Sequence, residues 1–236
     1  MLMRKQNGGG AGGENNIFWT TMSDLLLGLA IIFMTLFVLA MTGFSQETVK
    51  QKQTQIEASK ELVEKLKEAD IDASVDPLTG DVKISDLELF EVNSYQLSPK
   101  GKAYLDKLVP IYVDNIFSKE ELLSNITNIV VQGHTDSQQY ASLKTLNEQY
   151  IRNMTLSLQR ANSVAEYMFK TKINPAYDEK LRQMIVVEGR SFSNPILDSA
   201  GKEDFAKSRR VELKLKVKTY DILSRMGMLG FWNESE

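Results

Sequence analysis

The sequence predicts an α+β protein with a single N-terminal transmembrane helix, a helical linker and then a domain in which strands and helices alternate. Two observations lead to this prediction. Nearly all of the continuous apolar sequence lies before residue 45. After residue 73, short runs rich in Val and Ile alternate with longer helical patterns and are separated by turn signals.

The composition excludes several classes of protein. The chain has 28 basic and 31 acidic residues, a net charge of −3, so it lacks the basic excess typical of a nucleic-acid-binding surface. It has no cysteine and only one histidine, His134, which excludes disulfides, thiolate sites and His-rich metal sites. We therefore expect no metal, no cofactor and no nucleic-acid partner. A hydrolase would need paired carboxylates or a metal, and neither appears as a recognisable constellation; His134 also lacks a well-placed serine, so we expect no enzyme.

Residues 17–44 are the predicted transmembrane helix, and the Gly-rich residues 1–16 before it are predicted to be a flexible cytoplasmic tail. At about 1.5 Å per residue, the apolar run from Leu25 to Phe44 alone would cross the roughly 30 Å hydrocarbon core. A cleaved signal peptide is the alternative, but its apolar region would be shorter and an acidic residue at its start would be unusual.

An acidic residue, Asp24, lies in the first turns of this apolar helix. A carboxylate facing hydrocarbon is costly, so we expect Asp24 to face protein or a water-filled path, where it can take up and release a proton. The alternative is a hydrated position near the membrane surface, because Asp24 lies only about 10 Å along the helix from Ile17.

Residues 45–72 are predicted to be a helical linker. Val49, Ile56 and Val63 repeat every seven residues, with Leu66 at the companion position, which indicates a weak coiled-coil seam and at least a dimer. A solvated helix without a partner, or a plug helix, explains the same pattern.

Residues 73–218 are predicted to form the α/β domain, followed by a tail at 219–236. In Arg210–Lys218 apolar and charged residues alternate, so the charged side chains should form a solvated face of the sheet. The other predicted elements are a hairpin at 73–84, an extended run at 87–92, a helix opened by Ser98-Pro99, a strand at 126–132, a helix at 153–170 and a strand at 183–188.

Four segments, in this order, together resemble the OmpA-like domain family over about residues 80–218. They are Leu89-Phe-Glu-Val-Asn-Ser94, Ile129-Val-Val-Gln-Gly-His-Thr-Asp136, Asn153-Met-Thr-Leu-Ser-Leu-Gln-Arg-Ala-Asn162 and Ser208-Arg-Arg-Val-Glu-Leu213. The resemblance implies a βαβαβ-type sandwich that binds peptidoglycan stems.

The resemblance also implies the binding residues. Asp136 would pair with the ammonium of a diaminopimelate stem, and Arg160 would hold its carboxylate through the planar guanidinium. The remaining implied residues are Thr135, Asn153, Arg209 and Arg210. The sequence departs from the family pattern at Phe205 and Ser208 and in a longer loop after Asp136, and these departures concern the ligand more than the fold.

The N-terminal run Phe18-Trp-Thr-Thr-Met-Ser-Asp24-Leu-Leu, followed by such a domain, resembles the B-subunits of ion-driven stator units. This resemblance implies an inner-membrane homodimer inside a ring of a multi-span A-type subunit, with a cytoplasmic N-terminus, a periplasmic domain and ion transport at Asp24. Of the two best-known groups, the Zorya anti-phage defence motor is favoured over the flagellar stators by the compact linker and the long loop. A passive tether between membrane and cell wall is the remaining alternative.

Overall fold

The computed structural model describes residues 11–91, 94–139 and 143–218, except for the side chains of residues 11–16 and 43–48. The tails predicted at 1–10 and 219–236 therefore lie outside the described residues. The chain divides into two compact units, residues 1–50 and 51–236, and each is considered by itself.

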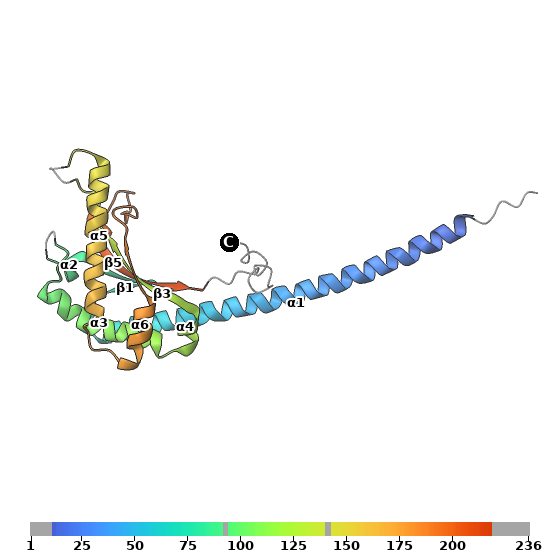
Figure 1. Ribbon diagram of the computed structural model, residues 1–236, viewed down its shortest axis with the longest axis horizontal. Helices are drawn as coiled ribbons and strands as arrows, with labels where there is room; N and C mark the ends of the chain where they lie inside the picture. Colours follow the sequence, from blue (N-terminus) through green and yellow to red (C-terminus); the bar gives the residue numbers. More distant parts are fainter. Residues whose placement is uncertain (1–10, 92–93, 140–142, 219–236) are drawn as a thin grey trace, which may run out of the picture. The chain divides into compact units, whose positions relative to one another are not determined.

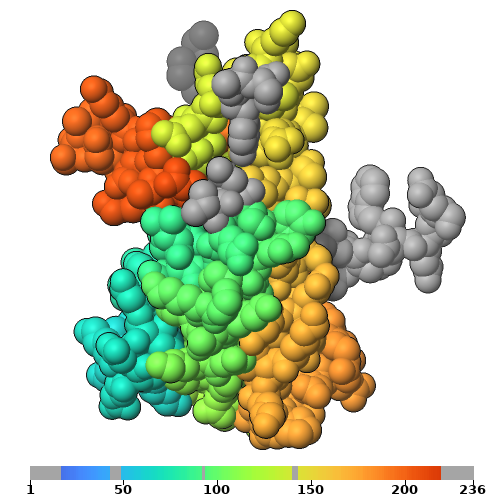
Figure 2. Space-filling model, turned by 90° about the vertical axis from the view of Figure 1, so that its left-hand side faces the viewer, coloured from blue at the N-terminus to red at the C-terminus, as the bar shows by residue number. Residues whose placement is uncertain are grey.

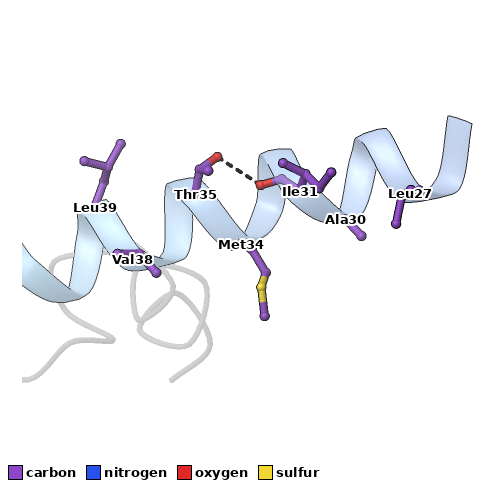
Figure 3. Close-up of a pocket in the computed structure, with 7 residues that line it drawn as sticks. All are labelled: Leu27, Ala30, Ile31, Met34, Thr35, Val38 and Leu39. Carbon is purple, nitrogen blue, oxygen red and sulfur yellow. Dashed lines mark hydrogen bonds between the residues drawn. The ribbon is translucent and has the colours of Figure 1, made fainter. Parts of the chain in front are cut away.

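The helix α1 runs from Ala11 to Glu68 (Figure 1). Within the described residues, its segment Ile17–Thr42 is long and apolar enough to cross a membrane, with a mean hydropathy of 2.6. The hydroxyls of Thr21, Thr35 and Thr42 donate to carbonyls three and four residues earlier, at 2.8–3.0 Å. Figure 3 shows the bond from Thr35 to Ile31 among exposed apolar side chains. These threonines therefore satisfy their polar groups within the helix, as a lipid environment requires.

Five strands form one sheet in the order β1-β2-β5-β3-β4. Their bounds are β1 Ser74–Val75, β2 Val82–Ser85, β3 Ile126–His134, β4 Ile185–Gly189 and β5 Arg210–Val217. The strand β5 is antiparallel to β2 and β3, and β3 is parallel to β4. The ends of β2, β3 and β4 and the start of β5 consequently lie at the same edge of the sheet.

The helices of the domain are α2 Asp86–Leu89, α3 Pro99–Phe117, α4 Glu120–Asn125, α5 Leu146–Met168, α6 Asp178–Met184 and α7 Phe205–Ser208, with a 3-10 helix η1 at Pro175–Tyr177. The predicted start of α3 is confirmed, because the Ser98 hydroxyl accepts a hydrogen bond from the backbone N–H of Gly101 at 2.9 Å. The prediction of an extended run at 87–92 is wrong for its first residues, which belong to α2. The mixed α+β fold itself is as predicted.

Helix α5 lies directly on the sheet because two strand positions carry glycine. A Cβ atom on Gly133 would lie 2.0 Å from the carbonyl oxygen of Ser157, and one on Gly189 would lie 2.8 Å from the backbone nitrogen of Leu158. No side chain fits at such distances. The yellow helix α5 can be followed across the sheet in Figure 1. Its close approach fixes the depth at which its inner side chains meet the strands.

The last part of α1 belongs to the domain. Ala58, Leu62 and Leu66 are only 2–3% exposed and join the hydrophobic core. The Asn115 side chain donates to the Ala58 carbonyl at 3.1 Å. The compact unit therefore begins at residue 51, whereas the sequence predicts its start at residue 73. Leu66, which the heptad pattern assigns to a coiled-coil seam, packs in the hydrophobic core of the domain.

The far face of the sheet, away from α5, is polar but less solvated than predicted. Glu212 and His134 are 3% and 1% exposed, although both stand on that face. The Gln132 amide lies between them and Glu188, to which it donates at 2.8 Å. Towards the end of β5, Lys216 is exposed. The predicted alternation of apolar and charged residues in β5 is thus correct, but the charged side chains are solvent-exposed only in the second half of the strand.

Candidate functional site

The strand edge where β2 and β3 end and β5 begins brings together most of the predicted binding residues. Thr135 and Asp136 directly follow β3, and Arg209 directly precedes β5. The Asp136 carboxylate accepts a hydrogen bond from Nη1 of Arg209 through Oδ2. Its Oδ1 accepts a longer one, at 3.3 Å, from the backbone N–H of Gln138. Asp136 is thus engaged by a cation of the same chain.

Arg160 reaches the same edge from α5 and is almost fully buried, with a side chain that is 4% exposed. Its Nη2 lies 3.2 Å from Oδ2 of Asp86, and its Nε donates to the carbonyl of Ser94 at 3.0 Å. The guanidinium carbon also stands 5.3 Å from the centre of the Phe90 ring. Salt bridge, carbonyl and ring hold the guanidinium in one orientation.

Asp86 is a member of this site that the sequence reasoning missed. It is the first residue of α2, and its backbone N–H donates to the carbonyl of Arg209 at 3.1 Å. Its Oδ2 lies 3.9 Å from Nε of Arg209. Burial raises the pKa of the Asp86 carboxyl, while the charges of Arg160 and Arg209 act in the opposite direction. Its position directly after a strand, like that of Asp136, was the available signal.

Thr135 and Asn153 are both buried beside this edge, at 3% and 2% exposure. The backbone N–H of Thr135 donates to the carbonyl of Ser191 at 3.0 Å, while its hydroxyl has no hydrogen-bond partner among the described residues. Asn153 lies two turns before Arg160 on the same side of α5, since seven residues make about two turns. Figure 2 shows the green segment of α2 and α3 beside the yellow to orange α5.

Arg210 is not brought together with the others. It stands opposite His134 in the pairing of β5 with β3, on the face of the sheet away from α5. Its guanidinium donates to Glu212 and, at 3.1 Å, to the carbonyl of Ser208. Burial alone would raise the pKa of Glu212, but the hydrogen bond and charge of Arg210 outweigh it and lower that pKa. Arg210 therefore serves an internal ion pair.

The single histidine is part of that internal cluster. Its Nε2 lies 3.0 Å from Oε1 of Gln132, and Glu212 Oε2 is 3.8 Å away. Burial, followed by the charge of Arg210, lowers the pKa of His134 from 6.5 to about 4. His134 is consequently neutral near pH 7 and is not placed as a charged contact for a ligand.

In the N-terminal unit, Asp24 is exposed on α1, and no group of the described residues pairs with its carboxylate. It is the only charged residue in the apolar segment Ile17–Thr42. The two predicted site regions, Asp24 and the strand edge, thus lie in separate units of the chain.

The strand edge suits recognition of charge. Within the described residues, no group of three or more His, Asp or Glu side chains is arranged to hold a metal ion. Two carboxylates, on Asp86 and Asp136, alternate with two guanidiniums, on Arg160 and Arg209. A ligand with an ammonium and a carboxylate would find both complementary charges within one cluster.

Comparison with known proteins shows the class. The model of the OmpA family matches residues 89–209, which include Phe90, Asp136, Arg160 and Arg209. The chain belongs to the OmpA family. It is also 30% identical over 212 residues to the Zorya protein ZorB of Escherichia coli (strain ATCC 8739, Crooks), and the match covers 86% of this chain and 88% of that relative.

Two solved structures have a similar fold. A putative MotB like protein from Desulfovibrio vulgaris is 20% identical, with a TM-score of 0.50, and the match covers 73% of this chain and 97% of that one. The periplasmic domain of Helicobacter pylori MotB is 18% identical, with a TM-score of 0.47, and the match covers 69% and 92%. The ZorB relative and the OmpA family match confirm the predicted resemblance to a ZorB-like protein that carries an OmpA-like domain.

Proposed function

We propose that this protein is the wall-anchored subunit of an ion-driven motor in the bacterial inner membrane, and that the motor belongs to an anti-phage defence system. The observation that carries the proposal is the lone carboxylate of Asp24 in the otherwise uncharged apolar segment Ile17–Thr42, in a chain whose relative is a Zorya protein. Such a carboxylate within a span marks an ion pathway more often than a structural role.

The proposal requires a partner. One apolar helix per chain cannot enclose an ion path, and the exposed apolar surface around Thr35 in Figure 3 has no neighbour within the described residues. A homodimer of this chain inside a ring of a multi-span subunit would cover that surface and give Asp24 a protein environment. In this arrangement the N-terminus is cytoplasmic, the domain is periplasmic, and the carried ion is a proton.

The domain would hold the cell wall through the strand edge. Its support is the charge cluster itself, in which a buried arginine on α5 and an aspartate after β3 lie at the same edge. A peptidoglycan stem with a diaminopimelate end carries an ammonium and a carboxylate, so Asp136 would bind the first and Arg160 the second. Thr135 and Asn153 would line the same pocket.

Wall binding is tested with the full chain in detergent micelles, sedimented with purified sacculi. We expect Asp136→Asn and Arg160→Gln each to weaken pelleting about tenfold or more, since a hydrogen bond to a charged group contributes about 1.5–3 kcal/mol. Glu179→Gln and Arg182→Gln, which remove charges from exposed positions on α6, are the matched controls. Equal pelleting of all four variants, each with an unchanged melting temperature, would contradict peptidoglycan binding at this edge.

Ion transport is tested with Asp24→Asn in cells that also carry the genes of the partner subunit. We expect phage protection to fall to the level of cells without the system, because an amide cannot take up and release a proton. Ser23→Ala, one residue away, is the control and should retain protection. If Asp24→Asn protects fully, the chain is a passive tether between membrane and wall.

A further inference from the structure

The edge cluster is balanced without any ligand. Two carboxylates and two guanidiniums pair internally: Arg209 with Asp136, and Arg160 with Asp86. A ligand ammonium would need the carboxylate of Asp136, whose Oδ2 is already held by Arg209. An ammonium that takes this oxygen displaces Arg209, and the guanidinium, whose side chain is only 29% exposed, is stabilised if another carboxylate accepts it.

The acceptor for that charge is already in place. We propose that Asp86 is a positioning residue which receives Arg209 when a ligand ammonium takes Asp136, so that the resting site is closed by its own ion pair. This inference rests on the proposed function of the strand edge. No covalent bond changes: Arg209 gives up its pair with Asp136 and closes on Asp86, while the ligand supplies a cation for Asp136 and an anion for Arg160.

Geometry favours Asp86 in this role. Its Oδ2 lies 3.9 Å from Nε of Arg209 in the resting state, within the range of an ion pair. Its Oδ1 is buried and has no hydrogen-bond partner among the described residues. The pairing of β2 with β5 fixes the two residues side by side, through the backbone hydrogen bond from Asp86 to Arg209.

The two arginines differ in their freedom to move. The side chain of Arg209 is 29% exposed, whereas that of Arg160 is 4% exposed and is held by Asp86, the Ser94 carbonyl and the Phe90 ring. Arg209 is therefore the mobile member of the cluster. When Arg209 moves to Asp86, that carboxylate is shared between two arginines. Asp86 then attracts Arg160 less strongly, so Arg160 binds a ligand carboxylate more strongly.

The exchange sets a requirement on the ligand. A molecule with only an ammonium displaces Arg209 but leaves the cluster with one excess positive charge, and a molecule with only a carboxylate leaves Arg209 on Asp136. Only a zwitterionic group supplies both a cation for Asp136 and an anion for Arg160, so only such a group leaves the cluster balanced. The ion pair of Arg209 with Asp136 also lowers the apparent affinity for the ligand. Only the fraction of molecules in which Arg209 has left Asp136 can bind.

The test is calorimetric titration of the full chain in detergent with a synthetic stem tripeptide that ends in diaminopimelate. Under the exchange, Arg209→Gln opens Asp136 and should tighten binding about tenfold, since it removes the competing state. If Arg209 instead contacts the ligand, the same variant should lose affinity, as Arg160→Gln does. Arg182→Gln, an exposed cation on α6, is the control for loss of a positive charge.

Asp86 is tested by a double-mutant cycle with Arg209. Asp86→Asn should weaken binding in the wild-type background. The loss of affinity should be smaller in the Arg209→Gln background, because no displaced cation then needs an acceptor. Asp86→Glu, which keeps the carboxylate, should restore binding if Asp86→Asn melts early. Equal costs in both backgrounds would overturn the exchange.

The two proposals fail in different ways. If the wild type binds and Arg160→Gln does not, while Arg209→Gln weakens binding, the wall-binding function stands and the exchange is wrong. If neither wild type nor Arg209→Gln binds the tripeptide, both the function and the exchange are wrong.

Discussion

At the scale of single residues, identical chemical groups behave differently according to what surrounds them. Asp136 and Asp86 both follow a strand at the same edge, yet one faces the more exposed Arg209 and the other the buried Arg160. Two neighbouring residues of the Ser208-Arg-Arg-Val run differ even more, because β-strand alternation sends Arg209 and Arg210 to opposite sides of the sheet. A sequence motif can therefore join residues that serve separate purposes.

His134 gives the residue-scale prediction. The folded domain keeps it neutral down to about pH 4, whereas the unfolded chain protonates it near pH 6.5. Between these values the unfolded state binds a proton that the folded state does not. The free energy of unfolding should therefore fall by up to about 1.4 kcal/mol per pH unit, or about 3 kcal/mol in all, as pH falls from 6.5 to 4.

Urea denaturation of residues 51–236 at pH 7, 6 and 5 measures this slope. His134→Gln should remove most of it, since the chain has no other histidine to titrate in that range. A variant that keeps the wild-type slope would show that carboxyl groups such as Asp86, whose pKa burial raises, control it instead.

At the scale of elements, the position of α5 decides whether the site exists. The helix carries Arg160, and its distance from the sheet is set by Gly133 and Gly189. The capping box formed by Thr145 and Glu148 fixes where the helix begins. The site residues on strands and on α5 therefore meet only because backbone approaches backbone without a side chain between them.

Gly133→Ala gives the element-scale prediction. Its new methyl group would lie 2.0 Å from the Ser157 carbonyl oxygen, so α5 must move outward and take Arg160 with it. We expect a loss of about 1–3 kcal/mol in unfolding free energy, typical of overpacking, together with loss of sacculus binding.

Gly201→Ala is the control for Gly133→Ala. Gly201 has a positive φ of 75° but open space around its Cβ direction, so its substitution should cost about 1 kcal/mol and leave binding intact. Equal binding by both variants would show that α5 does not set the geometry of the site.

The sequence predicts helices and strands better than it predicts which distant residues contact one another. Strand alternation, turn residues and the Ser98-Pro99 start are local signals, so β2, β3, β5 and α3 lie close to their predicted positions. The pairing of Asp86 with Arg160 joins residues 74 positions apart, and no local pattern contains it. The burial of Glu212 was missed for a similar reason, because one of the groups beside it, His134, lies on the neighbouring strand β3.

At the scale of the whole molecule, α1 contains the apolar segment Ile17–Thr42 in its first part and contributes to the domain core in its last part. The heptad pattern at residues 49–66 is typical of a helix that packs, but periodicity alone does not distinguish a second chain from the same chain. In the structure Leu62 and Leu66 pack against the domain itself. Whether Val49, which is 62% exposed, contacts a second copy remains a prediction.

Leu62→Ala tests this boundary in the fragment of residues 51–236. The side chain is 2% exposed, so its truncation should lower the unfolding free energy by about 2–5 kcal/mol. Leu78→Ala, at a position 67% exposed, is the control and should change it by less than about 0.5 kcal/mol. If both variants have the same unfolding free energy as the wild type, the end of α1 is a linker outside the domain, as the sequence predicts.

The attachment of α1 has a mechanical consequence. The Gln55 amide donates to the Thr79 carbonyl at 2.7 Å, Asn115 donates to Ala58, and Glu61 forms an ion pair with Lys119. These contacts lie along the flank of the helix, so tension applied along its axis loads them together, in shear. A strand pulled from a sheet edge would instead unzip one hydrogen bond at a time. The domain is therefore suited to bear a load that enters through this part of α1.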